Sequence, residues 1–143
     1  MLEVSQSDVE ARIARDNAWW ADGSSYLSPT ANFPKRIYFQ KFRELATDPR
    51  VRRAAVLMGP RRVGKTVMLY QLIEHLIASG VDPTCILYAS IDTPIYSQIP
   101  LAKYVDFFPD PPKENSQKTF YVIFDEVQYL PNWEVHLKDL VDS

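Results

Sequence analysis

The chain has 143 residues, 46% hydrophobic and 24% charged, values typical of a single globular domain with a buried core. Its net charge of −2 excludes a global basic field that would attract nucleic acid or an anionic membrane. Its single cysteine excludes an internal disulfide. No apolar run approaches membrane-spanning length and the N-terminus lacks the pattern of a secretory signal, so we expect a cytoplasmic protein with no membrane partner.

The first predicted element is a helix from Ser5 to Trp20. Ser5 or Ser7 can cap its N-terminus, because a serine hydroxyl accepts a hydrogen bond from a backbone N–H of the first turn. Val9, Ile13 and Trp20 lie near one face of this helix and are expected to pack inward.

A second helix is expected over residues 35–47. We assign both helices to an N-terminal extension, residues 1–50, that packs on a core formed by residues 51–143. Trp19 and Trp20 lie in this extension, and the preferred role for their large rings is to dock it on the core.

Residues 59–66 read Gly-Pro-Arg-Arg-Val-Gly-Lys-Thr, which matches the phosphate-binding pattern G-x-x-x-x-G-K-T. An apolar run at residues 54–58 precedes the motif and suits a buried strand, and helical spacing follows it over residues 67–77. Gly80 is expected to end this helix. Gly59 permits a sharp turn out of the strand, and Gly64 lets the backbone approach an oxyanion closely. The order of strand, loop and helix therefore indicates a P-loop nucleotidase.

The backbone N–H groups at the start of this helix are expected to point at phosphates, where the helix dipole favours negative charge. Lys65 is expected to reach the β- and γ-phosphates and to contribute to catalysis, and the Thr66 hydroxyl is expected to bind Mg²⁺. For the two arginines of the loop, a solvated position is favoured over a contact with phosphate, a subunit or nucleic acid. The predicted nucleotide-binding residues are Gly59, Pro60, Arg61, Arg62, Val63, Gly64, Lys65, Thr66 and Val67.

Four further elements follow in the predicted core. Residues 85–89 and 120–124 are rich in β-branched and aromatic side chains, which favours buried strands. Helices are expected over residues 96–108, interrupted or begun near Pro100, and from Pro131 onward. Alternating strands and helices imply an α/β fold whose parallel sheet is covered on both faces.

The expected fold class is therefore α/β, a P-loop NTPase with three layers, α/β/α, around a parallel sheet. Only three strands are expected, fewer than this fold normally contains. We therefore expect residues 51–143 to be the N-terminal part of the ATPase core, truncated so that the later strands are absent.

An acidic pair, Asp125 and Glu126, follows the strand predicted at residues 120–124. The carboxyl end of a parallel strand is where open α/β sheets bind ligands, and a cation there would offset the cost of burying carboxylates. We assign Asp125 to the Mg²⁺ site through coordinated water, and Glu126 to the base that orients and deprotonates the attacking water. The expected cofactors are ATP and Mg²⁺. A GTPase would carry Asp-x-x-Gly here, whereas the chain reads Asp-Glu-Val-Gln.

These motifs and two N-terminal segments resemble one family, the prokaryotic AAA-like P-loop ATPases, in which an AAA domain is followed by an uncharacterised C-terminal domain. The resemblance implies a Mg²⁺-dependent ATPase module that drives or switches that C-terminal domain, with homo-oligomers as a further partner class. It also implies that Lys65, Thr66, Asp125 and Glu126 have the roles given above. The segments that carry it are Asn17-Ala18-Trp19-Trp20, Arg36-Ile37-Tyr38-Phe39, residues 59–66, Asp125-Glu126-Val127-Gln128 and Pro131-Asn132-Trp133.

Three other functions stay open at this point. A P-loop kinase would transfer phosphate to a small acceptor, but we recognise no acceptor pocket or basic lid. A helicase-type nucleic-acid-dependent ATPase also uses Asp-Glu-x-Gln, but residues 90–94 show no strand-contacting motif. A nucleotide-binding scaffold without turnover is disfavoured by Glu126. A second possible role for Trp19 and Trp20 is to line the pocket that holds the adenine.

Overall fold

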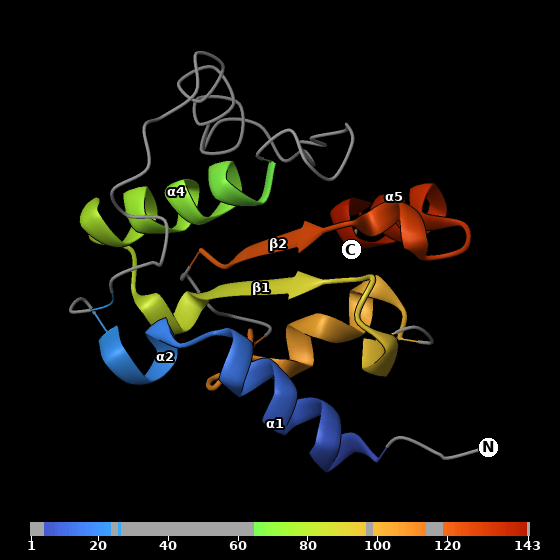
Figure 1. Cartoon of the computed structure of the whole chain (residues 1–143), viewed down its shortest axis with the longest axis horizontal. Helices are drawn as coiled ribbons and strands as arrows, with labels where there is room; N and C mark the ends of the chain where they lie inside the picture. Colours follow the sequence, from blue (N-terminus) through green and yellow to red (C-terminus); the bar gives the residue numbers. More distant parts are fainter. Residues whose placement is uncertain (1–4, 24–25, 27–64, 97–98, 114–118, 143) are drawn as a thin grey trace.

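The computed structural model describes residues 5–23, 26, 65–96, 99–113 and 119–142 (Figure 1). The second predicted helix and the strand predicted before the phosphate-binding motif lie outside the described residues. Short 3₁₀ turns connect the helices and strands. The helices and strands are α1 (Gln6–Asp16), α2 (Trp19–Asp22), α4 (Lys65–Ala78), β1 (Ile86–Ser90), β2 (Tyr121–Asp125) and α5 (Trp133–Asp142).

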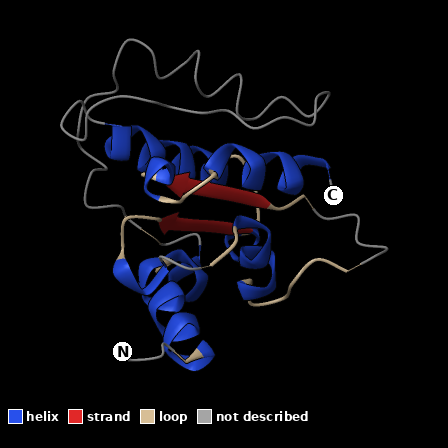
Figure 2. Ribbon diagram, turned by 90° about the vertical axis from the view of Figure 1, so that its right-hand side faces the viewer, coloured by secondary structure: helices blue, strands red, loops and turns tan. Residues whose placement is uncertain are grey.

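β1 and β2 form a parallel pair, which confirms the predicted strand direction (Figure 2). Ile86 lies opposite Tyr121 and Ser90 lies opposite Asp125, so the carboxyl ends of both strands meet at one edge of the pair. Each strand begins and ends one residue later than predicted, and Cys85 belongs to the 3₁₀ turn before β1.

Apolar side chains pack on both faces of this strand pair, because successive residues of a strand point to opposite sides. Ile86 and Tyr88 face the cluster that contains the buried residues of α4. Leu87 and Ala89 face a second cluster, built with α1, α5 and the 3₁₀ segment Leu101–Phe107. Burial on both faces is what a parallel pair of strands requires.

The prediction of one continuous N-terminal helix is wrong, because the helix is interrupted between α1 and α2 (Figure 1). Ser5 caps α1 by accepting a hydrogen bond from the Asp8 N–H at 3.2 Å. The break occurs at Asn17, whose φ of −114° and ψ of 62° are not helical. Its side-chain amide competes with the helix by donating back to the Ile13 carbonyl at 2.8 Å.

Asn17, Trp19 and Trp20 close the edge of β1 that faces away from β2. The Asn17 amide accepts from the Tyr88 N–H at 2.7 Å and donates to the Tyr88 carbonyl at 3.0 Å, as a neighbouring strand would. The two indole N–H groups both donate to the Ile86 carbonyl, at 2.8 Å and 2.7 Å. The tryptophans therefore dock the N-terminal helices on β1, the role preferred from the sequence. The domain boundary at residue 50 stays a prediction.

The helix predicted over residues 96–108 is wrong in type, although its predicted interruption near Pro100 is confirmed. The chain forms two 3₁₀ segments, Pro94–Tyr96 and Leu101–Phe107. Pro100 precedes the second one and disfavours a continuous α-helix, because proline lacks the N–H and restricts the residue before it. The buried residues of that segment lie three apart, at Leu101, Tyr104 and Phe107, which matches three residues per turn.

Glycine at position 80 ends α4. Its φ of 97° is unfavourable for other residues, and its N–H donates to the Ile77 carbonyl at 3.1 Å. The Val81 N–H donates to the Leu76 carbonyl, also at 3.1 Å, which completes the Schellman pattern. This confirms the predicted helix end and directs the chain toward β1.

Candidate functional site

The first turn of α4 and the carboxyl end of β2 form the candidate site. The Thr66 hydroxyl donates a hydrogen bond of 2.6 Å to Oδ2 of Asp125. Figure 1 shows α4 beside β2, with its N-terminal end toward the arrowhead of the strand. The structure therefore brings together two residues that are 59 positions apart and that the sequence assigned to one Mg²⁺ site.

The Asp125 carboxylate is buried, with 3% of the residue exposed, and polar donors surround it. Besides Thr66, the Tyr88 hydroxyl donates to Oδ2 at 2.8 Å, and the Glu126 N–H donates to Oδ1 at 3.0 Å. These donors compensate the loss of hydration that a buried carboxylate would otherwise suffer. Burial and the neighbouring Asp125 charge raise the pKa of Tyr88 far above its usual value, so its hydroxyl stays a donor at all ordinary pH values.

Glu126 has a left-handed backbone, with φ 55° and ψ 37°, directly after β2. This conformation is uncommon for a residue other than glycine, and such residues cluster at functional sites. The Gln128 amide donates to Oε2 of Glu126 at 2.7 Å, and the glutamate is 6% exposed. The predicted base is therefore a buried carboxylate held by a neighbouring amide.

The end of β1 adjoins the same site. The Ile91 N–H donates to the Asp125 carbonyl at 2.9 Å and extends the ladder one residue beyond the strands. Ser90 donates to Oδ1 of Asp92 at 2.6 Å. The carboxylate of Asp92 therefore lies just beyond this edge of the strand pair, in addition to those of Asp125 and Glu126.

The predicted site residues divide by whether the structure describes them. Thr66 and Val67 lie in α4, Asp125 ends β2 and Glu126 follows it. Lys65 is the first residue of α4, but its side chain lies outside the described part. The loop residues Gly59, Pro60, Arg61, Arg62, Val63 and Gly64 also lie outside the described residues.

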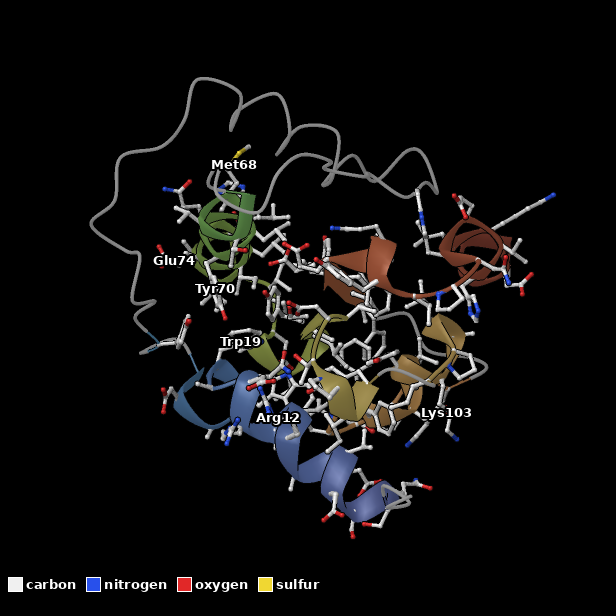
Figure 3. The ribbon with its side chains drawn as sticks, turned by 45° about the vertical axis from the view of Figure 1, so that its right-hand side comes forward. Arg12, Trp19, Met68, Tyr70, Glu74 and Lys103 are labelled. Atoms are coloured by element: carbon white, nitrogen blue, oxygen red, sulfur yellow. The ribbon has the colours of Figure 1, made fainter. Side chains whose placement is uncertain are left out.

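Two tyrosines at the site were not predicted from the sequence. Tyr88 bonds Asp125, and Tyr70 packs on Tyr88 with ring centroids 5.1 Å apart and the planes at 35°. Tyr70 lies four residues after Thr66, so both residues occupy the same side of α4, and Figure 3 shows Tyr70 on the side facing the strands. That spacing was the available signal for Tyr70, but its contact with Tyr88 depends on the packing of α4 against β1.

The residues present fit a Mg²⁺–nucleotide complex. Mg²⁺ prefers oxygen ligands and is usually held by one or two carboxylates together with waters and phosphates. A threonine hydroxyl and an aspartate carboxylate in contact, beside the N-terminus of a 14-residue helix, supply such oxygens where the helix dipole favours phosphate.

Comparisons with known proteins bear on the same part of the chain. A family model described as an AAA domain matches residues 51–143. A protein of Haemophilus influenzae (strain ATCC 51907 / DSM 11121 / KW20 / Rd), named only as uncharacterized, is 29% identical over 79 residues. The alignment covers 55% of this chain and 20% of that relative, so the chain spans a small part of the relative's length.

No solved structure matches. In the described part of the chain, no helix has the length and apolar character needed to cross a membrane.

Proposed function

The chain belongs to the AAA domain family, and from this membership we propose that it binds ATP at residues 59–66 and hydrolyses it with Mg²⁺. The resemblance to AAA-like P-loop ATPases is confirmed by the family match, which covers residues 51–143. Membership indicates a P-loop α/β fold and ATPase-type nucleotide binding. We propose the metal, the hydrolysis step and the roles of the individual site residues.

The observation that carries the proposal is the hydrogen bond between Thr66 and Asp125. The hydroxyl comes from the helix that follows the phosphate-binding motif, and the carboxylate comes from the end of a parallel strand. Neither feature is diagnostic alone, since Thr and Asp are common polar residues. Their contact at the helix N-terminus supports one shared site for phosphate and a divalent cation.

We assign Thr66 and Asp125 to hold Mg²⁺, Asp125 through coordinated water. When bound, Mg²⁺ would neutralise charge that develops on the phosphate oxygens. Lys65, at the start of α4, would neutralise the β- and γ-phosphates from the protein side. The three donors to Asp125 orient its carboxylate before a metal binds.

We assign Glu126 to the general base. It follows Asp125 directly, so its position is set by the same strand end. The amide of Gln128 donates to Oε2 of Glu126 at 2.7 Å, which supports a fixed orientation of the carboxylate that would accept a proton from water. We further propose a cytoplasmic protein in which this module drives or switches a C-terminal domain.

Phosphate release from ATP, measured with Mg²⁺ and with EDTA, tests this function. We expect Lys65→Ala to abolish both tight MgATP binding in calorimetry and phosphate release, because the β- and γ-phosphates lose their neutralising charge. Lys138→Ala, which removes an exposed lysine of α5, is the matched control and should behave as wild type. Unchanged affinity in a folded Lys65→Ala variant would refute the assignment of the loop.

The same assay separates the other functions considered from the sequence. Phosphate released to water without an acceptor, at a rate unchanged by added DNA, supports an ATPase over a small-molecule kinase or a nucleic-acid-dependent motor. In a chain that contains the later strands of the ATPase core, MgATP binding with no phosphate release would identify a scaffold and contradict the role of Glu126.

A further inference from the structure

Tyr88 makes a contact to the candidate metal site that its position in a buried strand did not predict. Its hydroxyl donates to Oδ2 of Asp125 at 2.8 Å, the same oxygen that accepts from Thr66 at 2.6 Å. Tyr88 is 5% exposed and belongs to β1, whereas Asp125 belongs to β2. One carboxylate oxygen therefore receives hydrogen bonds from two separate structural elements.

The Tyr88 side chain has little freedom to move. Asn17 holds its backbone N–H and carbonyl on one side of β1, at 2.7 Å and 3.0 Å. Tyr70 of α4 packs on its ring, with centroids 5.1 Å apart. The hydroxyl is thus held toward Asp125 before any ligand binds, and an interaction formed in advance costs no ordering at the moment of binding.

The two donors to Oδ2 differ in their proposed relation to the metal. Thr66 is a proposed metal ligand, so its hydroxyl oxygen would coordinate the cation while its hydrogen is donated to Asp125. Tyr88 is not assigned to the metal. With the Glu126 N–H on Oδ1, Tyr88 fixes the rotation of the carboxylate independently of the metal.

We propose that Tyr88 is a positioning residue for Mg²⁺, whose hydroxyl keeps the Asp125 carboxylate in the orientation that the hydrated metal requires. The proposal rests on the proposed function of the same site. It predicts that the Tyr88 hydroxyl affects nucleotide affinity only when the metal is present.

The test is Tyr88→Phe, which keeps the ring and its packing on Tyr70 but removes the hydroxyl. Calorimetry would measure ATP affinity in Mg²⁺ and in EDTA, and the ratio of the two affinities is the readout. We expect this ratio to fall about tenfold, which is about 1.4 kcal/mol, the size of one hydrogen bond to a charged group. Affinity in EDTA should stay at the wild-type value.

Tyr104→Phe is the matched control. Tyr104 is fully buried in the cluster on the other face of the strands, and its hydroxyl has no hydrogen-bond partner among the described residues. Its removal therefore deletes a buried tyrosine hydroxyl without touching Asp125, and the affinity ratio should not change. Mn²⁺ binding to the protein with ADP, followed by electron paramagnetic resonance, gives a readout of the metal itself.

A double-mutant cycle tests whether Tyr88 acts through Asp125. In an Asp125→Asn background, Tyr88→Phe should lower the ratio no further, because the carboxylate that it positions is already gone. A further tenfold loss would overturn the proposal. An unchanged ratio for Tyr88→Phe, equal losses with and without Mg²⁺, or a variant that does not fold would each overturn it too.

These outcomes are distinct from failure of the proposed function. If wild type binds ATP no better in Mg²⁺ than in EDTA, the metal assignment itself fails, and the role of Tyr88 with it. If wild type shows the Mg²⁺ dependence and Tyr88→Phe retains all of it, only the role of Tyr88 fails.

Discussion

Replacing Asn17 by alanine should destabilise the protein more than replacing any exposed polar residue of α1. Asn17 is fully buried, and its amide makes three hydrogen bonds, two of them to the backbone of Tyr88. The substitution leaves the Tyr88 N–H and carbonyl buried without these partners. Each unsatisfied buried group costs about 1–3 kcal/mol, so the free energy of unfolding should fall by about 3 kcal/mol.

Urea denaturation followed by circular dichroism measures this loss. A change of about 3 kcal/mol is a large share of the usual total of about 5–15 kcal/mol. It should lower Tm by about 10 °C for a chain of this size. Gln6→Ala is the control, because Gln6 is an exposed residue of α1 whose amide donates to Glu10 at 3.1 Å. Its effect should stay within about 0.5 kcal/mol.

Asn17→Asp separates the acceptor from the donor. The aspartate can still accept from the Tyr88 N–H, but it places a negative charge against the carbonyl oxygens of Ile13 and Tyr88. It should therefore cost at least as much as Asn17→Ala at neutral pH. A loss below about 1 kcal/mol for Asn17→Ala would refute the reasoning, since the edge of β1 would then have other partners.

Two more outcomes are expected. Glu126→Gln should keep MgATP binding but lower the hydrolysis rate by about 10²-fold or more, because an amide cannot take a proton. Glu134→Gln, at an exposed position of α5, is the control. Wild-type turnover in Glu126→Gln would exclude Glu126 as the base. Burial raises the pKa of Tyr70 to about 12, above its unfolded value of 10.0, so folding favours the protonated form; stability is fully present below pH 10 and should fall as the pH rises from about 10 to about 12. Urea midpoints against pH, with tyrosinate absorbance, would contradict this if they stayed constant across that interval.

Local patterns in the sequence were enough for the features that depend on neighbouring residues. The Ser5 cap and the end of α4 at Gly80 involve contacts within a few positions, and both were predicted. The helix predicted over residues 96–108 failed because apolar residues spaced by three fit a 3₁₀ segment as well as one face of an α-helix. A propensity argument cannot separate these two cases, since tertiary packing decides between them.

Contacts between distant elements account for the rest. The pairing of Thr66 with Asp125 was predictable because the phosphate-binding motif and the acidic pair are recognisable separately. The role of Asn17 depends on the backbone of a strand 71 residues away, and the role of Tyr88 depends on a carboxylate 37 residues away. Neither tyrosine nor asparagine carries a sequence signal for such a role.

At position 126, the residue that best suits the left-handed backbone differs from the residue proposed to act as the base. Glycine adopts φ near 55° without strain, and asparagine tolerates it better than most residues. Selection for stability alone, as in a protease-resistance screen of variants at this position, would therefore enrich glycine and asparagine. If Glu126 is the general base, as proposed, selection for phosphate release would retain glutamate, so the two selections should favour different residues at position 126.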